Sequence, residues 1–192
     1  YQRYFLFFGA IEPKKNVGRL IEAYLASGVS DPLVIIGKKA WKSVKDLQLI
    51  SGDGDTPRAQ ARIDSAEKQS CVLHFDYASF SLLVSLIRGA KAVLFPSLYE
   101  GFGLPALEAM SLGTPVLTSN TASMPEVVGE AALQIDPYDI RALVEGIRAL
   151  DSDADLRGRL AEAGPIRAQE FSPERYQARL AKLYGRFVPM QR

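Results

Sequence analysis

The stretch Phe95-Pro-Ser-Leu-Tyr-Glu-Gly-Phe-Gly-Leu-Pro-Ala-Leu-Glu108 decides the fold. The apolar run 92–95 opens it and is short enough to be a buried parallel strand. A helical segment at 104–112 follows and stops at the next glycine. Between them, Gly101 and Gly103 let backbone N–H groups approach a ligand because no Cβ stands in the way. A strand, a glycine-rich loop and a helix in this order predict an anion site at the carboxyl edge of a parallel sheet.

Two carboxylates frame this loop. Glu100 stands just before the glycines, and Glu108 lies about one turn into the helix. The helix is otherwise apolar or small except for Ser111, which is typical of a buried helix, and a buried carboxylate needs hydroxyl or cationic partners. Glu108 is therefore a candidate acceptor of hydrogen bonds from sugar hydroxyls. The alternative interpretation is an exposed helix position or an internal ion pair.

Pairs of lysines follow the first two predicted strands. Lys14 and Lys15 come after the first strand, and Lys38 and Lys39 come after the second. Both loops are expected at the same edge of a parallel sheet as the glycine-rich loop. Fixed N–H donors together with mobile positive charge would suit a diphosphate, although lysines in loops are often simply solvated.

The rest of the chain alternates strands and helices. Strands are predicted at 4–8, 33–36, 72–75, 92–95, 116–118 and 132–135. Helix N-caps are predicted at Asn16, Ser79, Asp139 and Asp153. This alternation predicts an α/β fold, a Rossmann-like doubly wound parallel sheet of about six strands. The expected domain is 1–171, with a helical C-terminal extension at 172–192.

Several local features are also predicted. Segments 41–50 and 58–68 are expected as helices, with a loop at 51–57 between them. The helix after Ser79 is expected to turn its leucines and isoleucine inward, namely Leu82, Leu83, Leu86 and Ile87. The helix after Asp153 is expected to break or kink at 164–165, where glycine precedes proline. The last helix carries an apolar stripe of Tyr176, Leu180, Leu183, Tyr184 and Phe187.

The central motif resembles the signature of family 4 glycosyltransferases of the GT-B fold, in which two glutamates flank Gly-Phe-Gly-Leu-Pro. The resemblance continues through 89–97, 108–120 and 123–129, and 8–16 looks like the first strand and phosphate loop of that family. It implies that the chain is the C-terminal, nucleotide-sugar-binding half of a GT-B enzyme. The acceptor-binding N-terminal domain would then be absent from this chain, and the final helix would cross back to it.

The resemblance also implies a set of site residues. The expected donor-binding residues are Gly9, Lys14, Lys15, Glu100, Gly101, Phe102, Gly103, Leu104 and Glu108. Lys15 falls on the phosphate-binding lysine of the family, and Glu100 would lie beside the donor sugar, so these two are the expected catalytic residues. Glu108 would hold the ribose hydroxyls.

The chain departs from the family pattern at two positions. A companion arginine of the phosphate-binding lysine falls on Ala10, so that contact is missing. Lys14 could supply charge there, but lysine does not reproduce the bidentate geometry of arginine. Asp76 stands where the family commonly has glycine near the base pocket, which puts base recognition by neighbouring Tyr77 in question.

The expected function is that of a retaining glycosyltransferase domain. Segments 12–16 and 37–41 look similar to bacterial mannosyltransferases of surface polysaccharide assembly, which points to GDP-mannose as donor. The acceptor would be a glycan or a lipid-linked glycan, held through the missing N-terminal domain. A non-catalytic nucleotide-sugar-binding domain and a GT-B-like epimerase are the alternatives.

Composition narrows the functional classes. The chain has 192 residues and a formal net charge of +1, which argues against a nucleic-acid partner. Cys71 and His74, the single residues of their kinds, offer no metal-ligand set, and neither a metal nor another cofactor is expected. No apolar run reaches about 18 residues and no signal peptide is visible. We expect a domain of a longer cytoplasmic protein, with peripheral association at the inner face of the membrane as an option.

Overall fold

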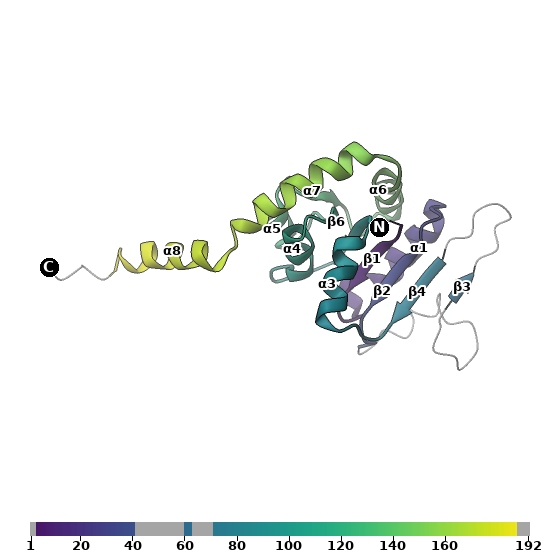
Figure 1. The fold of residues 1–192 in the computed structure, drawn as a ribbon, viewed down its shortest axis with the longest axis horizontal. Helices are drawn as coiled ribbons and strands as arrows, with labels where there is room; N and C mark the ends of the chain where they lie inside the picture. The colour runs from purple at the N-terminus through teal and green to yellow at the C-terminus, as the bar shows by residue number, and fades with distance from the viewer. Residues whose placement is uncertain (1–2, 41–59, 63–70, 188–192) are drawn as a thin grey trace.

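The computed structural model describes residues 3–40, 60–62 and 71–187, and these form a single seven-stranded sheet with flanking helices (Figure 1). The strands are β1 (Phe5–Phe8), β2 (Leu33–Ile36), β3 (Gln60–Arg62), β4 (Cys71–Phe75), β5 (Ala92–Phe95), β6 (Val116–Ser119) and β7 (Leu133–Ile135). Their order across the sheet is β3-β4-β2-β1-β5-β6-β7. All neighbouring strands pair in parallel except β3, which runs antiparallel to β4.

The chain builds this sheet outward from β1 in two directions, first through β2 to β4 and then through β5 and β6 to β7. The helices are η1 (Pro13–Lys15), α1 (Val17–Ser27), α3 (Phe80–Gly89), α4 (Leu104–Ser111), α5 (Met124–Val128), α6 (Ile140–Ser152), α7 (Ala154–Gln169) and α8 (Pro173–Tyr184). Right-handed crossovers in opposite directions place helices on both faces of the sheet. The predicted doubly wound, Rossmann-like parallel sheet of about six strands is confirmed, with one antiparallel edge strand added.

The added strand corrects a prediction. Segment 58–68 was expected to be helical, but its described part, β3, is a strand that pairs with β4 through Gln60↔Leu73 and Arg62↔Cys71. The edge of β4 offers unpaired backbone groups, and hydrogen bonding to them overrides the local preference of a polar segment. The helix expected at 41–50 and the loop at 51–57 lie outside the described residues.

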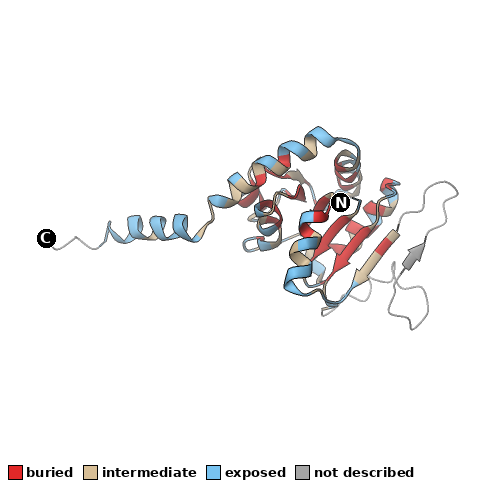
Figure 2. Cartoon of the chain, viewed as in Figure 1, coloured by how far each residue is buried: buried red, intermediate tan, exposed pale blue. Residues whose placement is uncertain are grey.

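The core runs through the middle of the sheet. Every residue of β1, β2, β5 and β6 is buried, so these strands form the red centre of Figure 2. Burial on both faces explains why they read as continuous apolar runs rather than alternating ones. Their carboxyl ends therefore lie on a rigid base, which positions the loops that follow.

Two helices differ from their predictions. Leu82 of α3 is exposed, because only the C-terminal part of the helix is buried, at Ile87 and Gly89. Helix α7 continues through Pro165, so of the break or kink predicted there the break is absent. A Cβ on Gly164 would lie 3.0 Å from the carbonyl oxygen of Met110, so α7 packs closely on α4, and this packing holds the helix together across the proline.

Helix α8 extends away from the rest of the chain (Figure 1). None of its residues is buried, and it is uniformly exposed or nearly so in Figure 2. The residues of the predicted apolar stripe that fall on α8 are therefore not buried by the rest of the described chain. Its start is fixed locally, since the Ser172 hydroxyl accepts a hydrogen bond from the N–H of Arg175.

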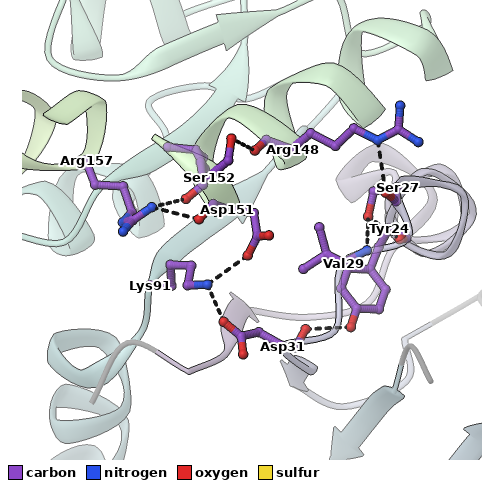
Figure 3. A network of polar contacts seen from close by, with 10 residues as sticks. Tyr24, Ser27, Val29, Asp31, Lys91, Arg148, Asp151, Ser152 and Arg157 are labelled. Atoms are coloured by element: carbon purple, nitrogen blue, oxygen red, sulfur yellow. Dashed lines mark hydrogen bonds and ion pairs between the residues drawn. The ribbon is translucent and has the colours of Figure 1, made fainter. Parts of the chain in front are cut away.

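A partly buried ion cluster joins elements at the amino ends of the strands (Figure 3). Lys91 directly precedes β5, and its ammonium pairs with two carboxylates. One belongs to Asp31, just before β2, and the other to Asp151, near the end of α6, at a distance of 2.8 Å. Tyr24 of α1 donates its hydroxyl hydrogen to the Asp31 carbonyl at 2.6 Å. This cluster stabilises the end of the sheet opposite the loops discussed next.

Candidate functional site

The site is built around an ion pair that is largely shielded from solvent. The Lys15 ammonium lies 2.5 Å from Oε1 of Glu100, and the two side chains are only 12% and 10% exposed. The ammonium also lies 4.7 Å from the centre of the Phe95 ring. Lys15 ends η1 after β1, and Glu100 belongs to the loop after β5, the neighbouring strand. The structure thus brings together the two residues that the sequence analysis expected to be catalytic.

The loop that carries Glu100 is held by hydrogen bonds along its length. The Leu98 N–H donates to the Lys14 carbonyl at 2.7 Å. The Thr121 hydroxyl donates to the Leu98 carbonyl at 3.3 Å, and the Ser123 hydroxyl donates to the Glu100 carbonyl at 2.9 Å. These contacts come from the loops after β1 and β6. The loop 96–103 between β5 and α4, called the signature loop below, therefore has a defined shape before any ligand binds.

The glycines of the loop have separate roles. Gly103 has φ +94°, and a Cβ there would lie 2.5 Å from the sulfur of Met124, so the position needs glycine for both conformation and space. A Cβ on Gly101 would meet nothing within 4 Å, which leaves room for a ligand beside it. Both observations agree with a loop that a ligand can approach.

The start of α4 offers an anion fewer free N–H groups than a full helix N-terminus does. Pro105 has no N–H, and the N–H of Ala106 already donates to the Gly103 carbonyl at 3.1 Å. The N–H groups of Phe102, Gly103 and Leu104 have no partner among the described residues. These three amides, from the loop and the first helical residue, are the donors available to an anion.

Glu108 stands at an exposed position of its helix, which is one of the interpretations that the sequence left open. Helix α4 buries Ala106, Ala109 and Met110 and leaves Glu108 exposed, although the apolar sequence around it had favoured a buried position. No hydrogen bond or ion pair holds its carboxylate within the described part of the chain. The protein around it nevertheless removes enough water to raise the pKa of the Glu108 carboxyl above its ordinary value. An acceptor without a protein partner remains available for a ligand.

The second lysine of the first pair is engaged elsewhere. Lys14 is exposed and pairs with Glu12 at 3.3 Å, so Glu12 offsets its charge. The loop after β2 lies beside this segment, because the N–H of Ile11 donates to the Lys38 carbonyl at 3.0 Å. The two lysine-bearing loops are therefore neighbours, as expected from the parallel sheet, although only Lys15 lies against Glu100.

Gly9 and Gly37 end the neighbouring strands β1 and β2 in close contact. Gly9 has φ +127°, and a Cβ on Gly37 would lie 1.9 Å from the Gly9 carbonyl oxygen. The Gly9 N–H donates to the Ile36 carbonyl at 2.9 Å. A Cβ on Gly9 would meet nothing within 4 Å, so the described residues leave room beside the end of β1.

Asn16 stands at the N-cap of α1, as predicted, but the partners of its side chain were not predicted. The residue adopts a left-handed conformation with φ +60°, and its side chain makes no cap hydrogen bond. The amide donates instead to the carbonyls of Pro96 at 3.1 Å and Pro137 at 2.8 Å. Arg19 donates to Oδ1 of Asn16 and lies over the ring of Tyr138. The tolerance of asparagine for left-handed backbone was the only signal in the sequence.

The aromatic residue of the signature loop contacts the end of α7. Phe102 meets Phe171 edge to face, with ring centres 5.5 Å apart. Arg167 lies over the Phe171 ring and donates from Nε to the Val127 carbonyl at 3.0 Å and from its Nη2 to the Glu126 carbonyl. The loop is therefore packed against the segment that leads into α8.

In the described ranges, no group of three or more His, Cys, Asp or Glu side chains could hold a metal ion. None of the helices in the same ranges combines the length and apolarity that a membrane span requires.

The fold and the family assignment place this chain among the glycosyltransferases. The sequence matches the profile of the family described as glycosyl transferases group 1 over residues 1–167, and the chain belongs to that family. The resemblance to GT-B glycosyltransferases is thereby confirmed.

Relatives agree with this assignment. The chain is 34% identical over 178 residues to O-antigen chain mannosyltransferase B of Escherichia coli, covering 91% of this chain and 43% of that protein. It is 41% identical over 170 residues to an MMP alpha-(1->4)-mannosyltransferase of Mycolicibacterium hassiacum, covering 84% and 40%. The chain thus spans about two fifths of the length of these relatives.

Solved structures share the fold. A sucrose-phosphate synthase from Thermosynechococcus elongatus superposes with a TM-score of 0.71 at 22% identity, covering 97% of this chain and 45% of that chain. An alpha,alpha-trehalose-phosphate synthase from Burkholderia vietnamiensis gives a TM-score of 0.70 at 14% identity, covering 88% and 39%. At these identities the likeness concerns the fold.

Proposed function

We propose that this chain is the donor-binding part of a retaining mannosyltransferase that uses GDP-mannose and glycosylates a glycan or lipid-linked acceptor. The family assignment and the mannosyltransferase relatives support the sugar. The acceptor would be bound by the part of the protein that lies beyond this chain. The reaction would take place in the cytoplasm, with the inner face of the membrane as the place where a lipid-linked acceptor is met.

The observation that carries the proposal is the Lys15–Glu100 pair, whose side chains are only 12% and 10% exposed, together with free backbone amides in the loop that carries Glu100. A lysine ammonium has three N–H donors, so one can remain on Glu100 while the others reach oxygens of a diphosphate. The amides of Phe102, Gly103 and Leu104 add fixed donors. Low solvent exposure strengthens each of these interactions relative to water.

The proposed chemistry follows from these charges. The bond between the anomeric carbon and the diphosphate oxygen breaks, and its electron pair leaves with the diphosphate. The acceptor hydroxyl oxygen forms the new bond to that carbon on the same face, and its proton passes to the departing diphosphate. Negative charge grows on the leaving group, where Lys15 and the loop amides would stabilise it, with Lys14 as a mobile second cation.

The two glutamates have different proposed roles. Glu100, held by Lys15, would lie beside the donor sugar and orient its hydroxyls or steady the positive charge on the ring. Glu108, whose carboxylate has no protein partner in the described chain, would accept hydrogen bonds from the ribose hydroxyls. Gly9, Gly101, Phe102, Gly103 and Leu104 would shape the space around the donor. Since lysine and amides can bear the leaving-group charge, we expect the reaction to need no metal or other cofactor.

A panel of nucleotide sugars tests the proposal. Thermal unfolding of the chain should be shifted upward by GDP-mannose more than by UDP-glucose or ADP-glucose at the same concentration, because ligands that bind only the folded state stabilise it. The full-length protein should transfer mannose from GDP-mannose to a glycan acceptor. Absence of a shift with all three nucleotide sugars would remove the proposed function.

A non-catalytic nucleotide-sugar-binding domain is the second candidate. Two features lower the positive charge at the diphosphate position. Ala10 stands where the family has arginine, and Glu12 offsets the charge of Lys14. Such a domain would bind GDP-mannose, but the full-length protein would neither transfer nor slowly hydrolyse it. Release of free mannose by the full-length protein and its loss in Glu100→Gln would favour the enzyme. An epimerase would instead convert the sugar of the donor without releasing it.

A further inference from the structure

Asn16 lies at the junction of three loops that meet at the carboxyl edge of the sheet. It is 5% exposed, and both hydrogens of its amide are used, one on the carbonyl of Pro96 after β5 and one on the carbonyl of Pro137 after β7. Its Oδ1 accepts a hydrogen bond from Arg19 at 3.0 Å. Every polar atom of the side chain therefore has a partner.

The position of Asn16 connects this arrangement to the ion pair. The preceding residue is Lys15, whose ammonium contacts Glu100 and the ring of Phe95. Phe95 in turn directly precedes Pro96, which accepts from the Asn16 amide. Two independent contacts thus hold this segment at the end of β5. The Asn16 amide holds the backbone next to Lys15 through the Pro96 carbonyl, and the Lys15 ammonium lies over the Phe95 ring.

The backbone of Asn16 supports the same interpretation. Its φ of +60° and ψ of +29° lie in the left-handed region, which non-glycine residues seldom adopt. In this conformation the residue closes η1, with its N–H donating to the Pro13 carbonyl at 3.2 Å, and starts α1. The turn between these two elements is what points Lys15 toward the signature loop.

We propose that Asn16 is the positioning residue of Lys15, and that its amide sets the place of the ammonium at which the donor diphosphate binds. The ligand part of this inference rests on the proposed function, whereas the positioning part does not. Asn16 itself touches neither Glu100 nor a reacting atom, so it acts only through Lys15.

Lysine labelling tests the positioning without a ligand. The rate at which acetic anhydride acylates individual lysines is measured by mass spectrometry in the wild-type chain, Asn16→Asp and Asn16→Gly. Aspartate keeps the shape but faces two carbonyls with acceptors only, and glycine keeps the left-handed backbone but loses the amide. Labelling of Lys15 should rise by about fivefold or more in both variants, because local opening exposes it.

Two internal references separate positioning from general loss of structure. Lys91 lies in the ion cluster at the opposite end of the sheet and should keep its low rate, and exposed Lys14 should keep its high rate. Gln134→Glu is the matched control, since Gln134 also donates an amide hydrogen to a backbone carbonyl, that of Gly129, outside this site. An unchanged Lys15 rate, or a joint rise of Lys15 and Lys91, would overturn the inference.

Binding then tests the ligand part. In calorimetry with GDP and GMP, Asn16→Asp should lower the affinity for GDP by about tenfold or more and leave the affinity for GMP nearly unchanged, because only the diphosphate reaches Lys15. Equal losses for both nucleotides would contradict the role of Asn16 at the diphosphate. Lack of GDP binding by the wild-type chain would reject the proposed donor, while the labelling result would still decide the positioning role.

Discussion

Glu100 and Glu108 belong to one motif, yet their surroundings are opposite. The Glu100 side chain is only 10% exposed, and its charge is balanced by Lys15 at 2.5 Å. Glu108 is exposed, has no partner in the described chain, and has a raised carboxyl pKa because nearby protein removes water from it. A paired acid suits a fixed position beside a reacting sugar, whereas an unpaired acid suits recognition of a ligand hydroxyl.

Glu108→Gln should separate stability from binding. The pKa of the Glu108 carboxyl is higher in the folded than in the unfolded state, so its negative charge destabilises the fold above the folded-state pKa. This destabilisation disappears as the pH falls below the pKa of the unfolded state, because the carboxyl is then protonated in both states. At about pH 7.5 the variant should unfold at the same or a slightly higher temperature than wild type, with no difference near pH 4. Its affinity for GDP should fall by about tenfold, the loss expected for hydrogen bonds to a charged group. A lower melting temperature at neutral pH would mean that Glu108 stabilises the fold through an ion pair.

Gly37→Ala should disrupt the contact between the ends of β1 and β2. The added methyl group would lie 1.9 Å from the Gly9 carbonyl oxygen, a backbone atom that cannot move without shifting β1. We expect the free energy of unfolding in urea to fall by about 3 kcal/mol. Gly101→Ala is the control, because its Cβ would meet nothing within 4 Å, and its stability should match wild type. Equal stability of both variants would show that the close approach is absent in solution.

At the scale of elements, Lys91 joins β5, the segment before β2, and α6 (Figure 3). Burial by itself would lower the pKa of Lys91, but hydrogen bonds and charge from Asp151 and Asp31 outweigh it and raise that pKa. Lys91 therefore contributes its full stabilisation below pH 10.5, the pKa of the unfolded state, and this stabilisation is lost as the pH rises through the higher pKa of the folded state.

Lys91→Met should cost about 2 to 3 kcal/mol of unfolding free energy at neutral pH. This lies below the range for fully buried pairs, because Asp31 and Asp151 remain 26% and 33% exposed. Chemical denaturation measures the loss, and Lys182→Met on exposed α8 should show none. A loss below about 0.5 kcal/mol would place this cluster among surface ion pairs.

The elements that the sequence predicted well are those with strong local signals. The runs of β2 and β5 are continuous and apolar, and their bounds were predicted without error. Asp139 and Asp153 cap α6 and α7 as expected, each accepting N–H hydrogen bonds of the first turn. Local patterns of this kind do not depend on distant parts of the chain.

The misjudged features depend on tertiary contacts. Residues 60–62 form a strand because β4 offers an edge, and α7 continues through Pro165 because Gly164 packs on α4. Asn16 bonds two carbonyls, one 80 and one 121 residues away in sequence. The sequence did identify Lys15 and Glu100 as a pair of interest, but only the fold shows that Glu108 is exposed and that Lys14 is paired with Glu12.

At the scale of the whole molecule, α8 contributes little to the stability of the rest. It buries none of its residues, so a chain ending at residue 171 should melt within about 2 °C of the full chain. Ending the chain at residue 153 also removes α7, which packs on α4, and should abolish cooperative unfolding. A drop above about 5 °C for the shorter deletion would show that α8 packs on the domain and would contradict the boundary expected at 171/172.

We propose that the junction between β5 and α4, with Lys15 from the neighbouring loop, binds the diphosphate of a nucleotide sugar. Calorimetric titration of GDP into the wild-type chain, Lys15→Ala and Lys182→Ala measures the contribution of this junction. Lys15→Ala should weaken GDP binding by about tenfold or more, as for a lost charge-assisted contact, while Lys182→Ala on α8 should bind like wild type. Equal affinity of all three proteins for GDP would show that the diphosphate does not bind at this junction.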